Sequence, residues 1–157
     1  MDLIIRRAAA ADADAAGALY LRARWAAAET GRIPPPAHPD AEVSEWISHV
    51  VIPRLECWLA RTPGGEVVGL LVLRDDWIDQ LYVDPDLTGR GIGARLLALA
   101  KRERPHGLHL WTFVSNQAAQ RFYERHGFTE VERTDGADNE ERPPAIRYVW
   151  NGPAPRG

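Results

Sequence analysis

A glycine-rich segment, Thr88–Gly93, separates a β-type run, Trp77–Val83, from an amphipathic helical run over Ile92–Glu103. Its three glycines let the backbone turn and approach a bound group without a Cβ in the way, and Arg90 adds positive charge. Unpaired N–H groups and the helix dipole favour phosphate where a strand ends and a helix begins. The segment therefore predicts a phosphate cradle, and a simple packing turn is the alternative.

Two nucleotide-binding motifs compete for this segment. A Walker A loop closes with Gly-Lys-Ser or Gly-Lys-Thr, whereas these glycines lead into Ala94-Arg95-Leu96. Gly89–Ala94 does satisfy the dinucleotide pattern, but a Rossmann unit needs a carboxylate about 20 residues further on, at the end of the next strand. That strand ends in Trp111-Thr112-Phe113-Val114 and has no carboxylate. A nucleotide-binding domain is therefore only a third interpretation.

The remaining chain alternates between strand and helix patterns. Prolines exclude a helix over Thr30–Pro39, which we expect to be a stiff connector. Helices are expected over Ala8–Ala28, Asp40–Val51 (ended by Pro53), Ile92–Glu103 and Asn116–His126 (capped by Ser115 and ended by Gly127). Strands are expected over Leu3–Ile5, Cys57–Ala60, Val67–Leu73, Trp77–Val83, Leu108–Val114, Phe128–Thr134 and Ala145–Trp150. The order β-α-α-β-β-β-α-β-α-β-β predicts a mixed α/β sheet in one domain, residues 1–151, with a disordered tail at 152–157.

Composition excludes several classes of partner. With 19 basic and 22 acidic side chains the formal charge is -3, so we expect no binding to nucleic acid. The longest apolar run, Val67–Leu73, is far below the roughly 20 residues that span a bilayer. Cys57 is the single cysteine and the start MDLIIRR lacks a signal pattern, so we expect a cytoplasmic protein. The five histidines are scattered, and no metal is expected.

Two motifs carry a resemblance to a known family. The first is Leu81–Pro85 running into Thr88–Gly93, and the second is Asn116-x-x-Ala119-x-x-Phe122-Tyr123-Glu124 followed by Gly127-Phe128. Together with the order of elements over residues 3–150, they resemble the GNAT superfamily of acyl-CoA-dependent N-acetyltransferases. The chain departs from the usual pattern at Thr88, where Gln or Arg is common, and at Ala9, where a helix-capping Thr or Ser is common.

The resemblance implies that Trp77–Val83 and Leu108–Val114 are adjacent parallel strands that separate, so that pantetheine lies between them. If Ile78, Leu81 and Val83 all face one core, their spacing also requires a bulge, although helices on both faces of the sheet would make this spacing uninformative. The residues expected to contact the cofactor are Leu81, Tyr82, Val83, Thr88, Gly89, Arg90, Gly91, Ile92, Gly93, Ala94, Asn116, Ala119, Phe122 and Tyr123.

Catalytic roles follow from the same resemblance. The backbone N–H of Val83 is expected to hold the oxyanion of the thioester carbonyl, and Tyr123 to act as general acid on the departing thiolate. Asp79 is the first candidate for general base and Asp76 the second, with a water chain as an alternative. Taken alone, Tyr123 beside Phe122 would indicate a core position, but the surrounding motif favours the general acid. Solvated carboxylates are the alternative for both aspartates. Cys57 reads as a small core hydrophobe rather than a nucleophile.

The sequence thus predicts direct transfer of acetyl from acetyl-CoA to the amine of a small molecule or of a peptide or protein N-terminus, by a monomer or a homodimer. The acceptor is expected among Tyr20, Trp25, Trp46 and Asp76, close to the Thr30–Pro39 connector and the 135–144 loop. The acidic run 138–141 in that loop favours a cationic amine. A silent acyl-CoA-binding sensor or interaction module is the alternative from a different class.

Overall fold

A mixed seven-stranded sheet forms the centre of the computed structural model, which describes residues 2–135 and 143–153. In this described part the order is β1-β2-β3-β4-β5-β7-β6, and neighbours are antiparallel except β4 and β5, which are parallel. The strands are β1 Ile4–Arg7, β2 Glu56–Arg61, β3 Val67–Arg74, β4 Trp77–Val83, β5 Leu108–Phe113, β6 Thr129–Thr134 and β7 Ala145–Trp150. The expected mixed α/β sheet is confirmed.

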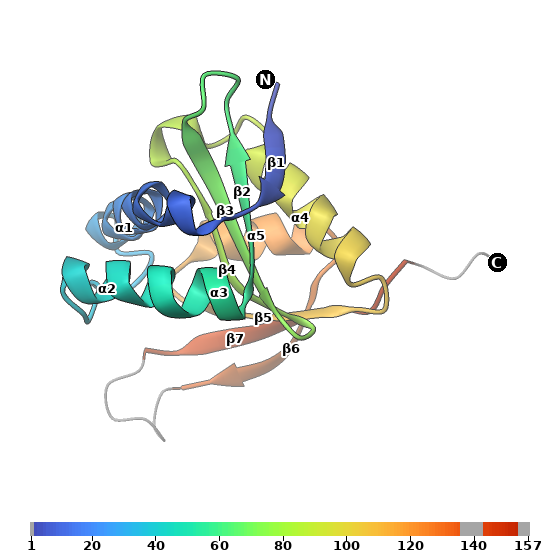
Figure 1. The fold of residues 1–157 in the computed structure, drawn as a ribbon. Helices are drawn as coiled ribbons and strands as arrows, with labels where there is room; N and C mark the ends of the chain where they lie inside the picture. The colour runs from blue at the N-terminus through green and yellow to red at the C-terminus, as the bar shows by residue number, and fades with distance from the viewer. Residues whose placement is uncertain (1, 136–142, 154–157) are drawn as a thin grey trace.

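Helices cover both faces of the sheet (Figure 1). α1 (Ala13–Glu29) and α2 (Asp40–Trp46) pack on one face, while α4 (Ile92–Glu103) and α5 (Gln117–Arg125) pack on the other. Strand β3 is buried on both faces: Leu71 and Leu73 belong to the α4–α5 core, and Leu70 and Val72 to the α1–α2 core. This continuous apolar run is what a central strand between two helical layers requires.

The helix expected to end before Pro53 continues beyond it, so the predicted boundary is wrong. After α2 the chain widens into a π-helical turn over Ile47–Val51 and then forms α3 (Ile52–Arg54). The Ile52 N–H bonds to the Ile47 carbonyl in the wider turn. This wider winding directly precedes Pro53, which has no N–H to donate, and the helix tolerates proline there.

The helix start predicted at Ser115 is also wrong, because Asn116 is the N-cap of α5. The Asn116 Oδ1 accepts a hydrogen bond from the Ala119 N–H at 3.2 Å. The Ser115 hydroxyl instead donates to the Arg32 carbonyl at 2.7 Å, which ties the connector after α1 to the end of β5. α1 begins at Ala13 rather than near Ala8, since Ala10–Asp12 forms a 3-10 turn. The expected tail, 152–157, lies outside the described residues from 154 onward.

We predict that Gly69→Val lowers the free energy of unfolding by about 1–3 kcal/mol, because overpacking strains a closed core. A Cβ at Gly69 would lie 2.8 Å from Leu96 Cδ1, 3.1 Å from Ile92 Cγ2 and 3.2 Å from Ala60 Cβ. Urea unfolding measures the change. Gly64→Val in the β2–β3 loop is the control, because a Cβ there meets only the Thr62 hydroxyl at 3.8 Å. Equal losses in both variants would contradict the packing argument.

Candidate active site

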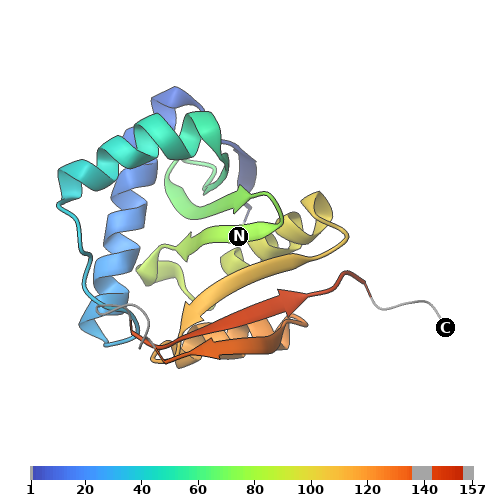
Figure 2. The same cartoon turned by 90° about the horizontal axis from the view of Figure 1, so that it is seen from below.

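Strands β4 and β5 separate almost as soon as they pair. Their parallel pairing in the described chain consists of Trp77 opposite His109, and the His109 N–H bonds to the Asp76 carbonyl at 2.9 Å. Figure 2 shows β5 running away from β4 toward the side where α1 and its connector lie. The separation expected for the cofactor is therefore present in the fold.

A bulge in β4 precedes this separated part. Leu73 pairs with Ile78 but Val72 pairs with Gln80, so Asp79 is the extra residue on β4. As a result Ile78 and, beyond the bulge, Leu81 and Val83 contact the same α4–α5 core. The bulge predicted from their spacing is confirmed.

Beyond the bulge, the backbone N–H and carbonyl groups of successive β4 residues point alternately toward β3 and away from it. The Asp84 N–H bonds to the Val68 carbonyl of β3 at 2.9 Å. Because bonding alternates along an antiparallel pair, Tyr82 also bonds toward β3, whereas Leu81 and Val83 direct their N–H and carbonyl groups the other way. Those groups of Leu81 and Val83 face the side that β5 has left. They form a polar edge that an extended ligand can pair with.

The glycine segment closes one end of this edge. Gly89 and Gly91 have φ of 79° and 85°, and a Cβ on either would meet nothing within 4 Å, so the turn needs their left-handed backbone and leaves open space beside it. α4 begins directly after Gly91 and has no acidic residue in its first turn. A Cβ on Gly93 would lie 3.4 Å from the Phe122 ring and 3.6 Å from Val83. The turn thus suits an anion and lies against both strand β4 and helix α5.

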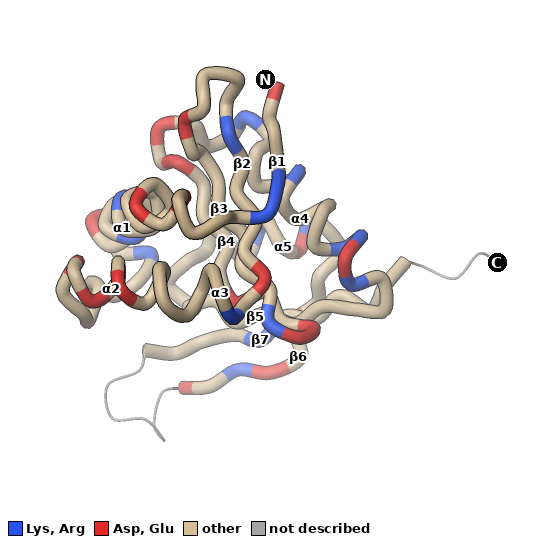
Figure 3. The backbone as a smooth tube through the Cα atoms, viewed as in Figure 1, with Lys and Arg blue, Asp and Glu red and all other residues tan. Residues whose placement is uncertain are grey.

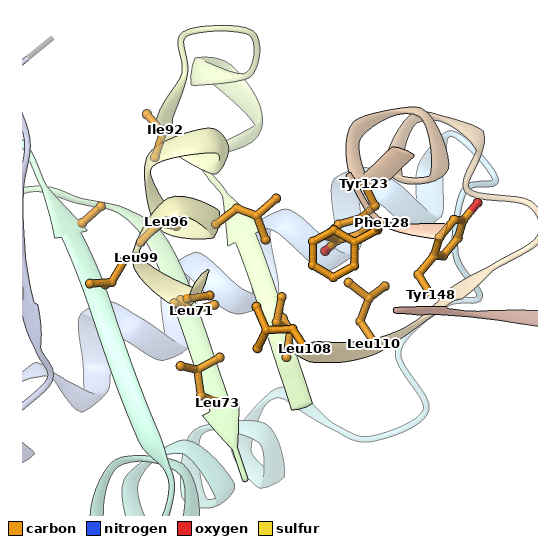
Figure 4. Packing of buried hydrophobic residues seen from close by; sticks show 14 of the residues in the cluster. Leu71, Leu73, Ile92, Leu96, Leu99, Leu108, Leu110, Tyr123, Phe128 and Tyr148 are labelled. Carbon is orange, nitrogen blue, oxygen red and sulfur yellow. The ribbon is translucent and has the colours of Figure 1, made fainter. Parts of the chain in front are cut away.

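Tyr123 is fixed by the way α5 ends. The Phe128 N–H bonds to the Tyr123 carbonyl at 3.0 Å and the Gly127 N–H to the Glu124 carbonyl at 3.1 Å, which is a Schellman motif. The rings of Tyr123 and Phe128 then pack edge to face at 5.5 Å, as Figure 4 shows. Burial, and secondarily the nearby Tyr82 phenol, raise the pKa of Tyr123, so its hydroxyl stays protonated.

The side chain of Tyr82 lies on the opposite face of β4, toward α1. Its ring meets that of Tyr20 edge-on at 5.3 Å, and Trp46 meets Tyr20 at 5.7 Å. Arg24, one turn after Tyr20, donates to the Tyr20 hydroxyl at 3.2 Å, and the Tyr82 phenol acts on the pKa of Arg24. Sequence reasoning missed Arg24, although its spacing of four from Tyr20 placed both on one helix face.

Other predicted residues lie apart from this arrangement. Asp76 precedes β4, and its carboxylate lies 3.3 Å from the His109 ring. It is at the opposite end of the strand from Val83, about 20 Å away along β4. Trp25 is exposed on α1. Asp79 lies in the bulge, where one carboxylate oxygen is 3.5 Å from an Arg74 nitrogen. The acidic run 138–141 lies outside the described residues.

Charges of both signs are interspersed on α1 and β6 (Figure 3). One ion pair, between Arg22 and Asp84 at 2.8 Å, ties α1 to the end of β4.

Within residues 2–135 and 143–153, no group of three or more His, Cys, Asp or Glu side chains has the arrangement of a metal site. None of the helices in the same part of the chain combines the length and apolar character that crossing a membrane requires.

Comparison with known proteins identifies the class that this fold and site define. The model of the acetyltransferase (GNAT) domain family matches residues 53–130. A peptidyl-lysine N-acetyltransferase, YjaB, from Salmonella typhimurium is 32% identical over 110 residues, covering 70% of this chain and 74% of its own. The solution structure of apo YjaB from Escherichia coli is similar with a TM-score of 0.75 and 24% identity, over 98% of this chain and 100% of that one.

A third similarity is to a Bacillus anthracis protein described as a streptothricin acetyltransferase, whose crystal structure contains acetyl coenzyme A. It is 25% identical, with a TM-score of 0.56 over 63% of each chain. The present chain belongs to the GNAT acetyltransferase family. It is an acetyl-CoA-dependent N-acyltransferase, as its two motifs predicted.

We predict that stability falls between about pH 9 and pH 12. Burial raises the pKa of Cys57, Tyr82 and Tyr148 to about 12, from ordinary values of 9.0 for the thiol and 10.0 for the phenols. The unfolded chain therefore loses these protons first, and the stability present below pH 9 is lost as pH rises toward 12. Urea unfolding across this range measures the decline in the free energy of unfolding. Cys57→Ala should abolish the decline between pH 9 and 10, because only the thiol has an ordinary pKa as low as 9.0. A free energy that stays level to pH 11 would contradict the burial of these groups.

Proposed function

We propose that this enzyme transfers the acetyl group directly from acetyl-CoA to the amine of a small molecule or a peptide. The observation that carries the proposal is the polar edge of Leu81 and Val83, which faces the space between β4 and β5. The glycine turn before α4 lies at one end of this edge, where the pyrophosphate is proposed to bind. Pantetheine is proposed to extend along the edge as an added strand does.

In the proposed reaction, the amine nitrogen attacks the thioester carbonyl, a C–N bond forms and the C–S bond breaks. The Val83 N–H is proposed to donate to the carbonyl oxygen as it gains charge, a contribution of roughly 3 kcal/mol for one such donor. Tyr123 is proposed to give its proton to the leaving thiolate. The hydroxyl is protonated at neutral pH and so available as a donor, while burial, which raises its pKa, makes it a weaker acid than an exposed tyrosine.

Removal of the ammonium proton needs a base, for which Asp79 is the proposed group. It lies on the same strand as Val83, and its side chain is 21% exposed, so it is open to a substrate or a water. Its charge also acts on the Tyr82 phenol, which supports the choice of a base on the α1 side of β4. A water chain ending at Asp79 is the alternative, while Asp76 lies at the far end of β4.

Two measurements test the proposed function against the sensor alternative. Acetyl-CoA and CoA are expected to raise the melting temperature, whereas ATP and NAD are not, because only the CoA species use the whole edge. Thiol release from acetyl-CoA across a panel of amines then reports turnover. Stabilisation by CoA without release for any amine would favour the sensor. Equal stabilisation by ATP would contradict the assignment of the glycine turn.

We predict that Tyr123→Phe lowers kcat by roughly 100-fold, the usual scale for a general acid, and leaves the affinity for CoA nearly unchanged. Tyr148→Phe is the matched control, since Tyr148 is also buried and its hydroxyl donates to Glu124 at 3.1 Å instead. Steady-state kinetics and CoA binding are measured for both variants. If both lose kcat to the same extent, Tyr123 supports packing rather than proton transfer.

The compartment and the side from which the acceptor approaches are proposed as well. A free and buried Cys57 is what a protein of the reducing cytoplasm commonly has, so we propose that location. The acceptor amine is proposed to approach from the α1 side of β4, since Tyr82 faces α1 and the connector is tied to the end of β5.

A further inference from the structure

Arg24 holds a positive charge inside an aromatic cluster on the α1 side of β4. Its guanidinium carbon lies 5.7 Å from the centre of the Tyr20 ring, and its Nη1 donates to the Tyr20 hydroxyl at 3.2 Å. The Tyr82 ring, which lies 5.3 Å from that of Tyr20, adds a second phenol to the cluster. The cluster of Tyr20, Arg24 and Tyr82 therefore links helix α1 to the strand that carries Val83.

The charge of Arg24 is not balanced by a carboxylate among the described residues. Eight ion pairs link side chains in that part of the chain, and none includes Arg24. Its Nε is buried and has no hydrogen-bond partner there. Holding a desolvated cation without an anion costs free energy, so such a group is a candidate for binding a charged ligand.

The two phenols add donors of their own. Arginine has no acceptor atom, so the Tyr20 hydroxyl oxygen that bonds Arg24 must accept from it. The O–H hydrogen of Tyr20 is then available to another acceptor, and the neighbouring Tyr82 phenol supplies a second O–H. A guanidinium beside such hydroxyls is suited to an anionic oxygen.

A negative charge lies on the strand that carries Tyr82. Asp79 precedes Tyr82 by three residues on β4, and its carboxylate is partly exposed. A molecule lying along this face meets a cation at Arg24 and an anion at Asp79. That order of charges matches a ligand with one carboxylate and one ammonium.

We propose that Arg24 binds the carboxylate of the acceptor, so that the acceptor is a small amine carrying a carboxylate, of the amino-acid type. The inference rests on the proposed function, because it uses the same acceptor side and the same attack at the carbonyl held by Val83. The carboxylate anchors the molecule at Arg24 and leaves its ammonium toward Asp79. A lysine side chain within a polypeptide brings no such carboxylate.

The test compares matched acceptors with the full-length enzyme and acetyl-CoA. Free amino acids are each assayed beside the corresponding carboxamide, with a C-terminally amidated lysine peptide as a further arm. The kcat/KM for the preferred amino acid is expected to exceed that for its amide by at least about 10-fold, the scale of one charge-assisted hydrogen bond. Equal values for acid and amide, or a preference for the amidated peptide, would overturn the proposal.

Variants of α1 separate recognition from stability. Arg24→Gln is expected to lower kcat/KM roughly 30-fold for the acid but less than about 3-fold for the amide, and Arg24→Lys to recover part of the preference. Arg22 lies on the same helix as Arg24 and pairs with Asp84 at the end of β4. Arg22→Gln should therefore leave the ratio of kcat/KM for the acid to that for the amide unchanged. The melting shift with acetyl-CoA checks that each variant is folded. Equal losses for acid and amide in Arg24→Gln would assign Arg24 a structural role and overturn the proposal.

The outcomes also distinguish this proposal from the function on which it rests. Turnover of amines without regard to the carboxylate would remove the role of Arg24 and leave the acetyltransferase assignment of the site intact. Failure of every amine to release thiol would remove both.

Discussion

The departure of β4 from β5 after a single residue pair is the constraint on which the rest of the site depends. A strand inside a sheet normally satisfies its backbone on both sides, and leaving a neighbour exposes one set of N–H and carbonyl groups. Here those groups belong to Leu81 and Val83, between two helical layers. Water or a ligand must hydrogen-bond to these groups. The backbone alone therefore provides a binding edge for an extended polar partner, independently of any side chain.

Contacts around this separation hold its two sides in place. The pair Arg22–Asp84 ties α1 to the end of β4, and the Ser115 hydroxyl ties the end of β5 to the connector at Arg32. The end of α5 fixes Tyr123 through backbone bonds and its ring contact with Phe128. The groups proposed to act in catalysis are thus borne by a strand and a helix rather than by loops, a placement that favours precise geometry.

Sequence patterns predicted the features that depend on local chemistry. The bounds of β4 and α4 and the glycine turn followed from apolar spacing and from turn residues, which act within a few positions of the chain. The cap at Asn116 rather than Ser115, and the role of Arg24, did not follow. Both depend on contacts between distant segments. The Ser115 hydroxyl donates to the Arg32 carbonyl, and the Tyr82 phenol acts on Arg24 only because β4 packs against α1. Spacing along one helix carries no information about such partners.

The bulge at Asp79 decides which face each later residue of β4 presents. Side chains alternate along a strand, so without an extra residue Ile78 and Tyr82 would share a face, and Leu81 and Val83 would turn to α1. With it, Tyr82 meets Tyr20 on the α1 side, while Val83 lies against Gly93 and the α5 ring of Phe122. One inserted residue therefore separates the aromatic side of β4 that faces α1 from the side that faces Gly93 and α5. That same inserted residue, Asp79, carries the carboxylate proposed above to take the proton of the attacking amine.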